Sequence, residues 1–414
     1  MTREERSWIM YDVANSAFVL IMVTAVMPVF FKSIAAAGMA QSASTAVWGY
    51  AVSAASLITA LLSPFLGSYA DFRGRKKKLF SLFLLSGTAA TMLLALTGRG
   101  DWIYCTILFI IAKMSWASTN VFYDSFLTDV TSPERMDRVS SHGYAWGYIG
   151  SVVPFVAVII ILLHAGENPS VNSYRVSFLI TAVWWIIFSV PMLRNVRQVH
   201  YIEPGSSPLR ESIAKLASTL RNVRGHRNVF IFLAAYFLYI DGVDTIIEMA
   251  AAYGIDSGMG TTSLILAILM IQVLAFPFAL LYGRLAEKYS ARNLITAGII
   301  VYMIITAAAF FLPDIKSAVS KNIMFWVISF MVATSMGGIQ ALSRSYFGKI
   351  IPAEKSAEFF GLYNIFGKFA TIIGPFLMGI ATTLTGSSRY GVLCIVFLFL
   401  AGLFMLRCTK EPSV

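Results

Sequence analysis

The amino-acid sequence predicts an all-α membrane protein of twelve transmembrane helices in two six-helix bundles. Three observations favour this fold class: 57% of the 414 residues are hydrophobic and only 13% are charged, the hydrophobic residues fall in twelve runs, and one polar segment divides these runs six and six. Soluble domains have about 25% charged residues, so this chain lacks the polar surface that water requires. We therefore expect a bilayer to cover most of it.

The twelve runs are long enough for helices that cross a bilayer, which need about 20 residues each. The chain enters the first run without a small-residue cleavage site, so we expect a spanning helix there rather than a removed signal peptide. The approximate limits are 8–34, 45–67, 79–98, 103–127, 141–164, 174–194, 229–252, 262–283, 293–312, 323–347, 357–382 and 390–407.

The polar segment 195–227 predicts a linker outside the membrane between two bundles, 1–194 and 228–414. It contains Pro204 and Gly205 followed by a basic stretch, a composition typical of loops. The net charge of +11 has a topological explanation and does not indicate a nucleic-acid partner. Basic residues concentrate in cytoplasmic loops, which places both chain ends in the cytoplasm. Outside the spans, the Lys and Arg residues on the opposite side are Lys32, Arg99, Arg175, Lys316, Lys321 and Arg389.

A short motif recurs after the second span of each half. Glycine is followed by an acid four residues on, a small residue three further, and a base two beyond. Such internal repeats are common in membrane carriers. The matching residues are Gly67, Asp71, Gly74 and Lys76 in the first half, and Gly283, Glu287, Ser290 and Arg292 in the second.

The first copy of this motif resembles the signature of the major facilitator superfamily, Gly-x-x-x-Asp-Arg/Lys-x-Gly-x-Arg/Lys-Arg/Lys. Phe72 departs from it, because the superfamily usually has a base there. The resemblance implies two bundles that work by alternating access, with the motif acid latching the cytoplasmic side. The residues that fit are Gly67, Asp71, Gly74, Lys76 and Lys77.

A narrower resemblance lies in the first span, in the string Tyr11-Asp12-Val13-Ala14-Asn15-Ser16. It is similar to a family of facilitators related to the vacuolar amino-acid effluxers of autophagy. The stretches Phe359-Phe360-Gly361-Leu362-Tyr363, Gly367-Lys368 and Gly374-Pro375 also look like that family. This resemblance implies an amino-acid exporter.

Ionisable side chains inside the predicted spans are few, and each costs ~2.5–3.5 kcal/mol near the bilayer centre. Asp241, Asp244 and Glu248 share one face of the seventh span, because they recur at i, i+3 and i+7. The fourth span carries Lys113 and Asn120 on one face, and the eleventh carries Asn364 and Lys368. By analogy with the superfamily, the two lysines are expected to face the acids of the seventh span across a cavity.

These residues predict a binding site for a zwitterion, since a lysine can hold a carboxylate and an acid can hold an ammonium. The acids could also relay protons. In the alternative interpretation, Lys113 and Lys368 only neutralise the acids and lock the halves together. Asp12 and Asn15, one turn inside the first span, are candidates for coupling or gating, and Asp12 could equally cap the helix.

The motif loop is predicted to gate the cytoplasmic side. Asp71 is expected at a helix N-terminus or paired with a base such as Arg138, and Arg344 is expected to reach the membrane surface or to pair in the gate. Basic residues of this loop also fix its topology. The gating set is Gly67, Asp71, Arg73, Gly74, Arg75, Lys76, Arg138 and Arg344.

The predicted function is secondary active transport of a small polar solute, with protons as coupling ion, membrane lipids as surroundings, and a monomer in a bacterial inner membrane. No cofactor, metal or nucleic acid is expected, and no nucleophile–base pair suggests an enzyme. Gly361 to Lys368 fails as a phosphate loop, because its glycines are six residues apart and Phe369 replaces the hydroxyl residue. A lipid flippase on the same fold is the alternative.

Overall fold

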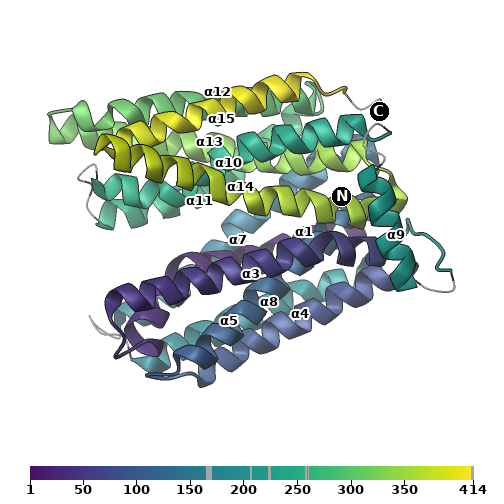
Figure 1. Cartoon of the computed structure of the whole chain (residues 1–414), viewed down its shortest axis with the longest axis horizontal. Helices are drawn as coiled ribbons and strands as arrows, with labels where there is room; N and C mark the ends of the chain where they lie inside the picture. Colours follow the sequence, from purple (N-terminus) through teal and green to yellow (C-terminus); the bar gives the residue numbers. More distant parts are fainter. Residues whose placement is uncertain (165–169, 206–207, 222–224, 257–258, 260, 412–414) are drawn as a thin grey trace. The chain divides into compact units, whose positions relative to one another are not determined.

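The structure is a computed structural model of the whole chain, and it describes residues 1–164, 170–205, 208–221, 225–256, 259 and 261–411. The described residues are almost entirely helical (Figure 1), which confirms the all-α prediction. An isolated bridge pairs Phe72 with Ile202.

The elements up to the linker contain the first six predicted spans. They are α1 (Arg3–Phe18), η1 (Val19–Ala25), α2 (Val26–Phe30), η2 (Phe31–Ala35), α3 (Gln41–Ala70), α4 (Arg75–Leu93), η3 (Leu94–Leu96), α5 (Trp102–Ser125), α6 (Leu127–Val130), η4 (Pro133–Arg135), α7 (Met136–His164) and α8 (Val171–Asn195).

The remaining elements contain one linker helix and the other six predicted spans. They are α9 (Pro208–Arg221), α10 (Arg227–Asp256), α11 (Thr261–Leu285), α12 (Ala291–Phe311), η5 (Leu312–Asp314), α13 (Ala318–Ile350), η6 (Ala353–Lys355), α14 (Ser356–Thr385) and α15 (Ser388–Arg407).

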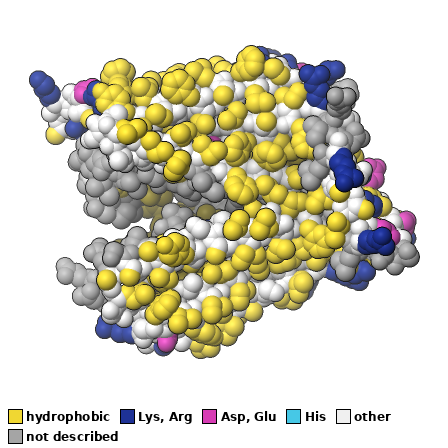
Figure 2. All heavy atoms as spheres, viewed as in Figure 1, with side chains coloured by type: hydrophobic (Ala, Val, Ile, Leu, Met, Phe, Trp, Pro, Cys, Tyr) yellow, Lys and Arg dark blue, Asp and Glu magenta, His cyan; other side chains and the backbone are white. Residues whose placement is uncertain are grey.

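Within the described part of the chain, 11 helices are long and apolar enough to cross a membrane. The other predicted span, 357–382, lies in α14, where some side chains are outside the described residues. The count of twelve and the cytoplasmic placement of the chain ends therefore stay predictions. Hydrophobic side chains cover long faces of the helices, while Lys and Arg gather at helix ends (Figure 2).

Several helices begin a few residues before their apolar runs, because polar residues cap them. Thr2 accepts from the backbone of Glu5 and forms a capping box at α1, and Ser170 and Ser290 cap α8 and α12. Each hydroxyl satisfies an N–H group that the first helical turn leaves free. Hydropathy alone does not detect these polar turns.

The first span changes its helical winding twice, through the π-helical segments η1 and η2. Pro28 lies between them in α2. Proline has no N–H group and its ring collides with the carbonyl four residues earlier. The wider π turns next to Pro28 accommodate this defect, so the span continues without ending at the proline.

The helices pack into two compact units that differ from the sequence halves at two segments. The first unit comprises 1–130, 146–216 and 352–362, and the second comprises 131–145, 217–351 and 363–414. The beginning of α7 thus packs with the second unit, and the beginning of α14 packs with the first.

The linker is more structured than its polar composition suggests. Residues 196–203 run along the motif loop. There, Ile202 accepts a backbone hydrogen bond from Arg73 and donates one to Asp71. The helix α9 follows, and the carbonyl of Ser212 accepts a hydrogen bond of 3.1 Å from the Ser68 hydroxyl of α3. Hydropathy did not predict α9, because α9 is a short amphipathic helix and not a long apolar run.

Candidate functional site

Asp71 directly follows α3 and contacts the N-terminus of α14, within the first unit. Its two carboxylate oxygens accept the backbone N–H groups of Ala357 at 2.9 Å and Glu358 at 3.0 Å. These N–H groups lack partners within the helix and carry the positive end of its dipole. Asp71 was expected either at a helix N-terminus or paired with a base such as Arg138, and the structure places it at a helix N-terminus.

Burial is nearly complete at Asp71, which is 1% exposed. This burial raises its pKa from 3.8 to about 7, although Lys76 and the two N–H groups favour the charged form. Around neutral pH, the carboxyl group therefore divides between its charged and neutral forms. Protonation of Asp71 therefore weakens the hydrogen bonds that it accepts from Ala357 and Glu358 of α14.

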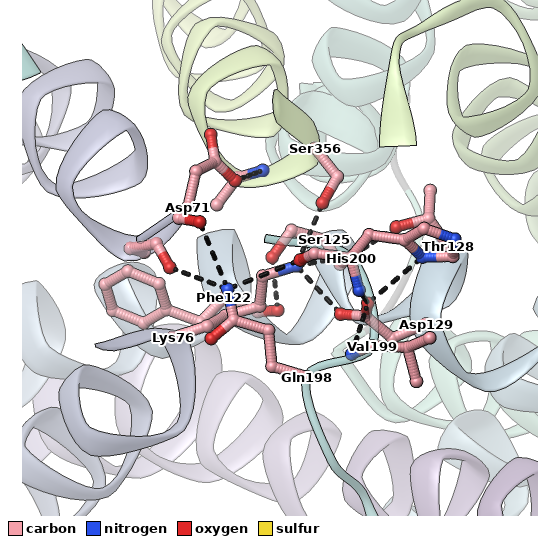
Figure 3. Close-up of polar contacts among 12 residues, drawn as sticks. Asp71, Lys76, Phe122, Ser125, Thr128, Asp129, Gln198, Val199, His200 and Ser356 are labelled. Carbon is pink, nitrogen blue, oxygen red and sulfur yellow. Dashed lines mark hydrogen bonds and ion pairs between the residues drawn. The ribbon is translucent and has the colours of Figure 1, made fainter. Parts of the chain in front are cut away.

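Lys76 is fully buried in the first turn of α4. Its ammonium donates to Asp129 at 2.8 Å and to the Ser356 hydroxyl at 2.9 Å. A buried cation requires such a partner, because desolvation otherwise costs several kcal/mol. Lys76 thereby ties the motif loop to the end of the fourth span and to the beginning of α14 (Figure 3).

Asp129 also holds the linker. Its second oxygen accepts the N–H groups of Val199 at 3.0 Å and His200 at 2.8 Å, and the His200 ring lies 3.3 Å away. The neighbouring Asp129 carboxylate raises the pKa of His200 above its usual 6.5, against the opposing effect of burial. We call Asp71, Lys76, Asp129, His200 and Ser356 the motif–linker cluster.

Phe72, which departs from the superfamily signature, has a structural role next to this cluster. Its side chain is buried, its backbone pairs with Ile202, and the Lys215 ammonium of α9 lies 4.0 Å from the ring centroid. A cation over an aromatic face is stabilised by about 1 kcal/mol. A base at position 72 would remove both the apolar packing and this contact.

The other motif residues lie at the surface of the same loop. Gly74 has φ +70° and precedes α4, a left-handed conformation that favours glycine. Arg73 pairs with Glu203 of the linker at 3.0 Å, and Arg75 lies over the Tyr69 ring at 5.3 Å. Both arginines therefore support the local loop structure in addition to any topological role.

The second unit repeats part of this arrangement. Glu287, the counterpart of Asp71, lies 3.4 Å from Arg138 of α7. Gly283, the counterpart of Gly67, packs closely on Ser141 of α7. Arg138 thus pairs with the acid of its own unit, so the expected pairing of Arg138 with Asp71 is not the one observed.

Arg344 is buried at 2% exposure, so the expectation that it reaches the membrane surface is wrong. Its guanidinium donates to the hydroxyl and carbonyl of Ser140 at 2.9 and 3.1 Å and lies 4.4 Å from the Tyr144 ring centroid. Close by, Asp137 accepts from Ser345 and Lys349, both at 2.6 Å. These contacts join α7 to α13 within the second unit.

Asp12 and Asn15 form a buried polar network in the first unit, so Asp12 does not cap α1 at its end. Asp12 accepts from the Tyr123 hydroxyl at 2.7 Å and from the Asn15 amide at 3.4 Å. The Asn15 carbonyl in turn accepts from the Trp116 indole at 2.7 Å. The Trp8 ring stacks on Tyr123 at 4.5 Å between centroids, which encloses this site.

The other candidates on the fourth span are Lys113 and Asn120. The Lys113 ammonium donates to the Val52 carbonyl at 3.4 Å and the Ser56 hydroxyl at 3.3 Å, both on α3. The side-chain oxygen of Asn120 is buried and has no hydrogen-bond partner among the described residues. Because the acids of the seventh span belong to the other unit, the expected pairing of Lys113 with Asp241 stays a prediction.

Asp241 is fully buried in the second unit. One carboxylate oxygen accepts the N–H group of Gly374 at 2.8 Å and the Thr245 hydroxyl at 3.4 Å, so Asp241 links α10 to α14 next to Pro375. Asp244 and Asn364 are partly exposed. The side chains of Glu248 and Lys368 lie outside the described residues.

Sequence reasoning missed Tyr123, Asp129 and His200. Tyr123 is four positions from Thr119, whose hydroxyl accepts from Tyr11 at 2.7 Å, so a polar stripe on the fourth span could have indicated it. Asp129 directly follows the apolar run of the same span. No signal in the linker marks His200, because its role depends on a contact between distant segments.

We expect a His200→Gln variant to lose stability in a pH-dependent way. The raised pKa of His200 means that its contribution is present below pH 6.5 and is lost as pH rises through the folded-state pKa. The difference in Tm between wild type and variant should therefore be largest near pH 5.5 and shrink towards pH 8. A difference that stays constant across this range would contradict the role assigned to the ring.

Comparisons with known proteins define the class. The proton:xylose symporter XylE has a TM-score of 0.75 at 13% identity, covering 99% of this chain and 96% of its own. The transporter FucP has a TM-score of 0.73 at 14% identity, covering 99% and 98%. The fold is therefore that of the major facilitator superfamily.

The chain belongs to the vacuole effluxer Atg22 like family, whose model matches residues 1–134 and 128–411. It is 42% identical to the uncharacterized MFS-type transporter YxiO of Bacillus subtilis, over all of this chain and 96% of that protein. It is 28% identical to Autophagy-related protein 22-1 of Penicillium rubens over 64% of this chain, but spans only 46% of that longer protein. The protein is a multi-pass membrane transporter for a small molecule, and not an enzyme.

Proposed function

We propose that the protein exports amino acids or related zwitterions across a bacterial cell membrane by alternating access, with protons as coupling ion. The observation that carries this proposal is a buried carboxylate on the first span of each half, Asp12 on α1 and Asp241 on α10. The family of vacuole effluxers supports export, and the bacterial relative supports the membrane. The solute class rests on the resemblance of the first span to the amino-acid effluxers of autophagy.

Buried carboxylates of this kind are suited to exchange a positive charge. Asp12 accepts from a hydroxyl and an amide, and Asp241 accepts from a backbone N–H group and a hydroxyl. These donors are neutral groups that hold each carboxyl group in place. A proton or a substrate ammonium arriving at either carboxyl group lowers the cost of burying it.

The surroundings of Asp12 favour an ammonium. The rings of Trp8 and Tyr11 lie 4.5 and 4.8 Å from the Tyr123 ring between centroids, and aromatic faces attract cations when water is excluded. Lys113 on α5 offers a positive charge for the solute carboxylate. A lipid flippase is the alternative function. A buried polar network of this size argues against it, because the acyl chains of a lipid would need an apolar path.

The motif–linker cluster would then control access from the cytoplasm. It joins α3, α4, the end of the fourth span, the linker and the beginning of α14. Release of these contacts frees α14 from the motif loop, and the proton-sensitive Asp71 offers one trigger for that release.

The test is transport by the purified protein in proteoliposomes loaded with a mixture of the twenty amino acids. A proton gradient is imposed, and each amino acid in the external medium is quantified by mass spectrometry. We expect one or a few amino acids to leave faster than from protein-free vesicles, and Asp12→Asn to slow this release at least about tenfold. The Tyr123 hydroxyl can still donate to the carbonyl oxygen of the introduced amide, so the local packing should survive.

A parallel sample with a fluorescent phospholipid tests the alternative. If the lipid changes leaflet and no amino acid moves faster than in the control vesicles, the flippase replaces the carrier as the function. If neither moves but the protein binds an amino acid, the proposed direction or coupling ion is wrong.

A further inference from the structure

A basic pocket of about 630 Å³ lies where the motif loop meets the linker in the first unit. We propose that it binds a phosphate-bearing anion at the membrane boundary, and that the geometry favours a lipid headgroup as the source. No step of transport described above uses this pocket. Its lining residues are Arg73, Gly74, Lys77, Lys78, Ser81, Arg197, Gln198 and Tyr201.

Four of these residues are cationic, and their charges are only partly compensated. Arg73 is paired with Glu203 at 3.0 Å, and the Lys77 ammonium donates to the Val196 carbonyl at 2.8 Å. Lys78 and Arg197 are exposed, and neither forms an ion pair with a described residue. One ammonium and one guanidinium group thus remain available for an anion, and guanidinium groups match phosphate geometry.

The pocket lies at the ends of two predicted spans, where we expect the headgroups of a bilayer. Lys78 is followed on the same face of α4 by Leu82 and Leu85, which are 57% and 63% exposed, as expected for side chains that face lipid. On α8 the exposed residues Val183 and Ile187 lie on the face that ends at Arg194. A lipid with its chains along these faces would place its phosphate beside Lys78.

The charge pattern selects the chemistry of the ligand. Cations just outside a span attract anionic lipids by about 1 kcal/mol for each Lys or Arg. A zwitterionic headgroup carries a compensating cation, which these side chains would repel. The proposed ligand is therefore an anionic phosphate compound, and the apolar faces below the pocket are what favour a lipid over a soluble phosphate.

An occupied pocket would also strengthen the gate region. Its walls come from both the motif loop and the linker, so an anion between Lys78 and Arg197 bridges α4 to the segment that continues to His200. The ligand would hold the linker against the motif loop through charges that otherwise repel one another.

The experiment measures the binding of dye-labelled phosphatidylglycerol to the full-length protein in a neutral detergent. The test variant is Lys78→Gln with Arg197→Gln. The matched control is Arg284→Gln with Lys288→Gln, which removes two exposed cations from the equivalent loop of the second half. At roughly fivefold for each cation, we expect the test variant to bind about 20- to 30-fold more weakly and the control to bind within about threefold of wild type.

Competition identifies the source of the phosphate. If unlabelled phosphatidylglycerol displaces the label, and phosphatidylcholine and millimolar inorganic phosphate do not, the ligand is a lipid headgroup. Displacement by inorganic phosphate supports a soluble anion at the same residues. Unchanged binding by the test variant, or an equal loss in the control, overturns the proposal, and the thermal stability of both variants shows whether they are folded.

Discussion

Replacement of Asp241 by Asn should abolish gradient-driven transport while leaving the fold intact. The Asn carbonyl oxygen can still accept the N–H group of Gly374, which Asp241 accepts at 2.8 Å, and Asn has the same shape. The contact between α10 and α14 should therefore persist, and Tm should change by only about 1–2 °C. Loss of a positioned proton-transfer group commonly costs 10²–10⁴-fold, so we expect gradient-driven transport to fall at least about 100-fold.

Two transport assays separate the possible roles of this carboxylate. If Asp241 carries the coupling proton, the variant should lose uphill transport but keep exchange of labelled for unlabelled solute across the membrane. If it holds the substrate ammonium, both activities should disappear. Gly374→Ala provides the structural comparison, because its added Cβ would collide with Thr245 and lie 2.7 Å from the Asp241 carboxylate, lowering Tm and transport together. Normal uphill transport by Asp241→Asn would leave Asp241 with a purely structural role.

The helices could be located from the sequence because the bilayer imposes a strong constraint. A spanning helix must satisfy its own backbone groups and expose apolar side chains to lipid, so run lengths identify it. The beginning of α7 belongs to the second unit and the beginning of α14 to the first, and no hydropathy pattern in the sequence indicates this. It depends on contacts such as those of Asp71 with Ala357 and Glu358, which are far apart in the chain.

The candidate sites were predictable to different degrees. Asp12 and Asp241 could be singled out because a carboxylate in an apolar run is costly. Their distant partners could not, since Asp241 accepts from the backbone of Gly374 and Asp12 accepts from Tyr123 on a different span. The structured linker was missed for a related reason. It is held by Asp129 and Phe72, which lie outside the linker and are not marked by its own composition.

Replacement of Gly67 by Ala should disrupt the predicted gate more than any surface change in the motif. A Cβ at this position would collide with the backbone carbonyl of Ala357, and backbone cannot rotate away as a side chain can. The end of α3 and the beginning of α14 would have to separate. This separation breaks the two hydrogen bonds that Asp71 accepts, and bonds to a charged group contribute about 1.5–3 kcal/mol each.

We therefore expect Gly67→Ala to lose about 3 kcal/mol or more of unfolding free energy and most of its transport activity. At a few degrees for each kcal/mol, Tm should fall by at least about 5 °C. Gly49→Ala is the matched control on the same helix, because a Cβ there meets no atom within 4 Å. The helix should gain about 0.5–1 kcal/mol from replacing glycine by alanine. Equal behaviour of the two variants would show that α3 and α14 do not need close approach at Gly67, and the gating role of the motif–linker cluster would then have to be abandoned.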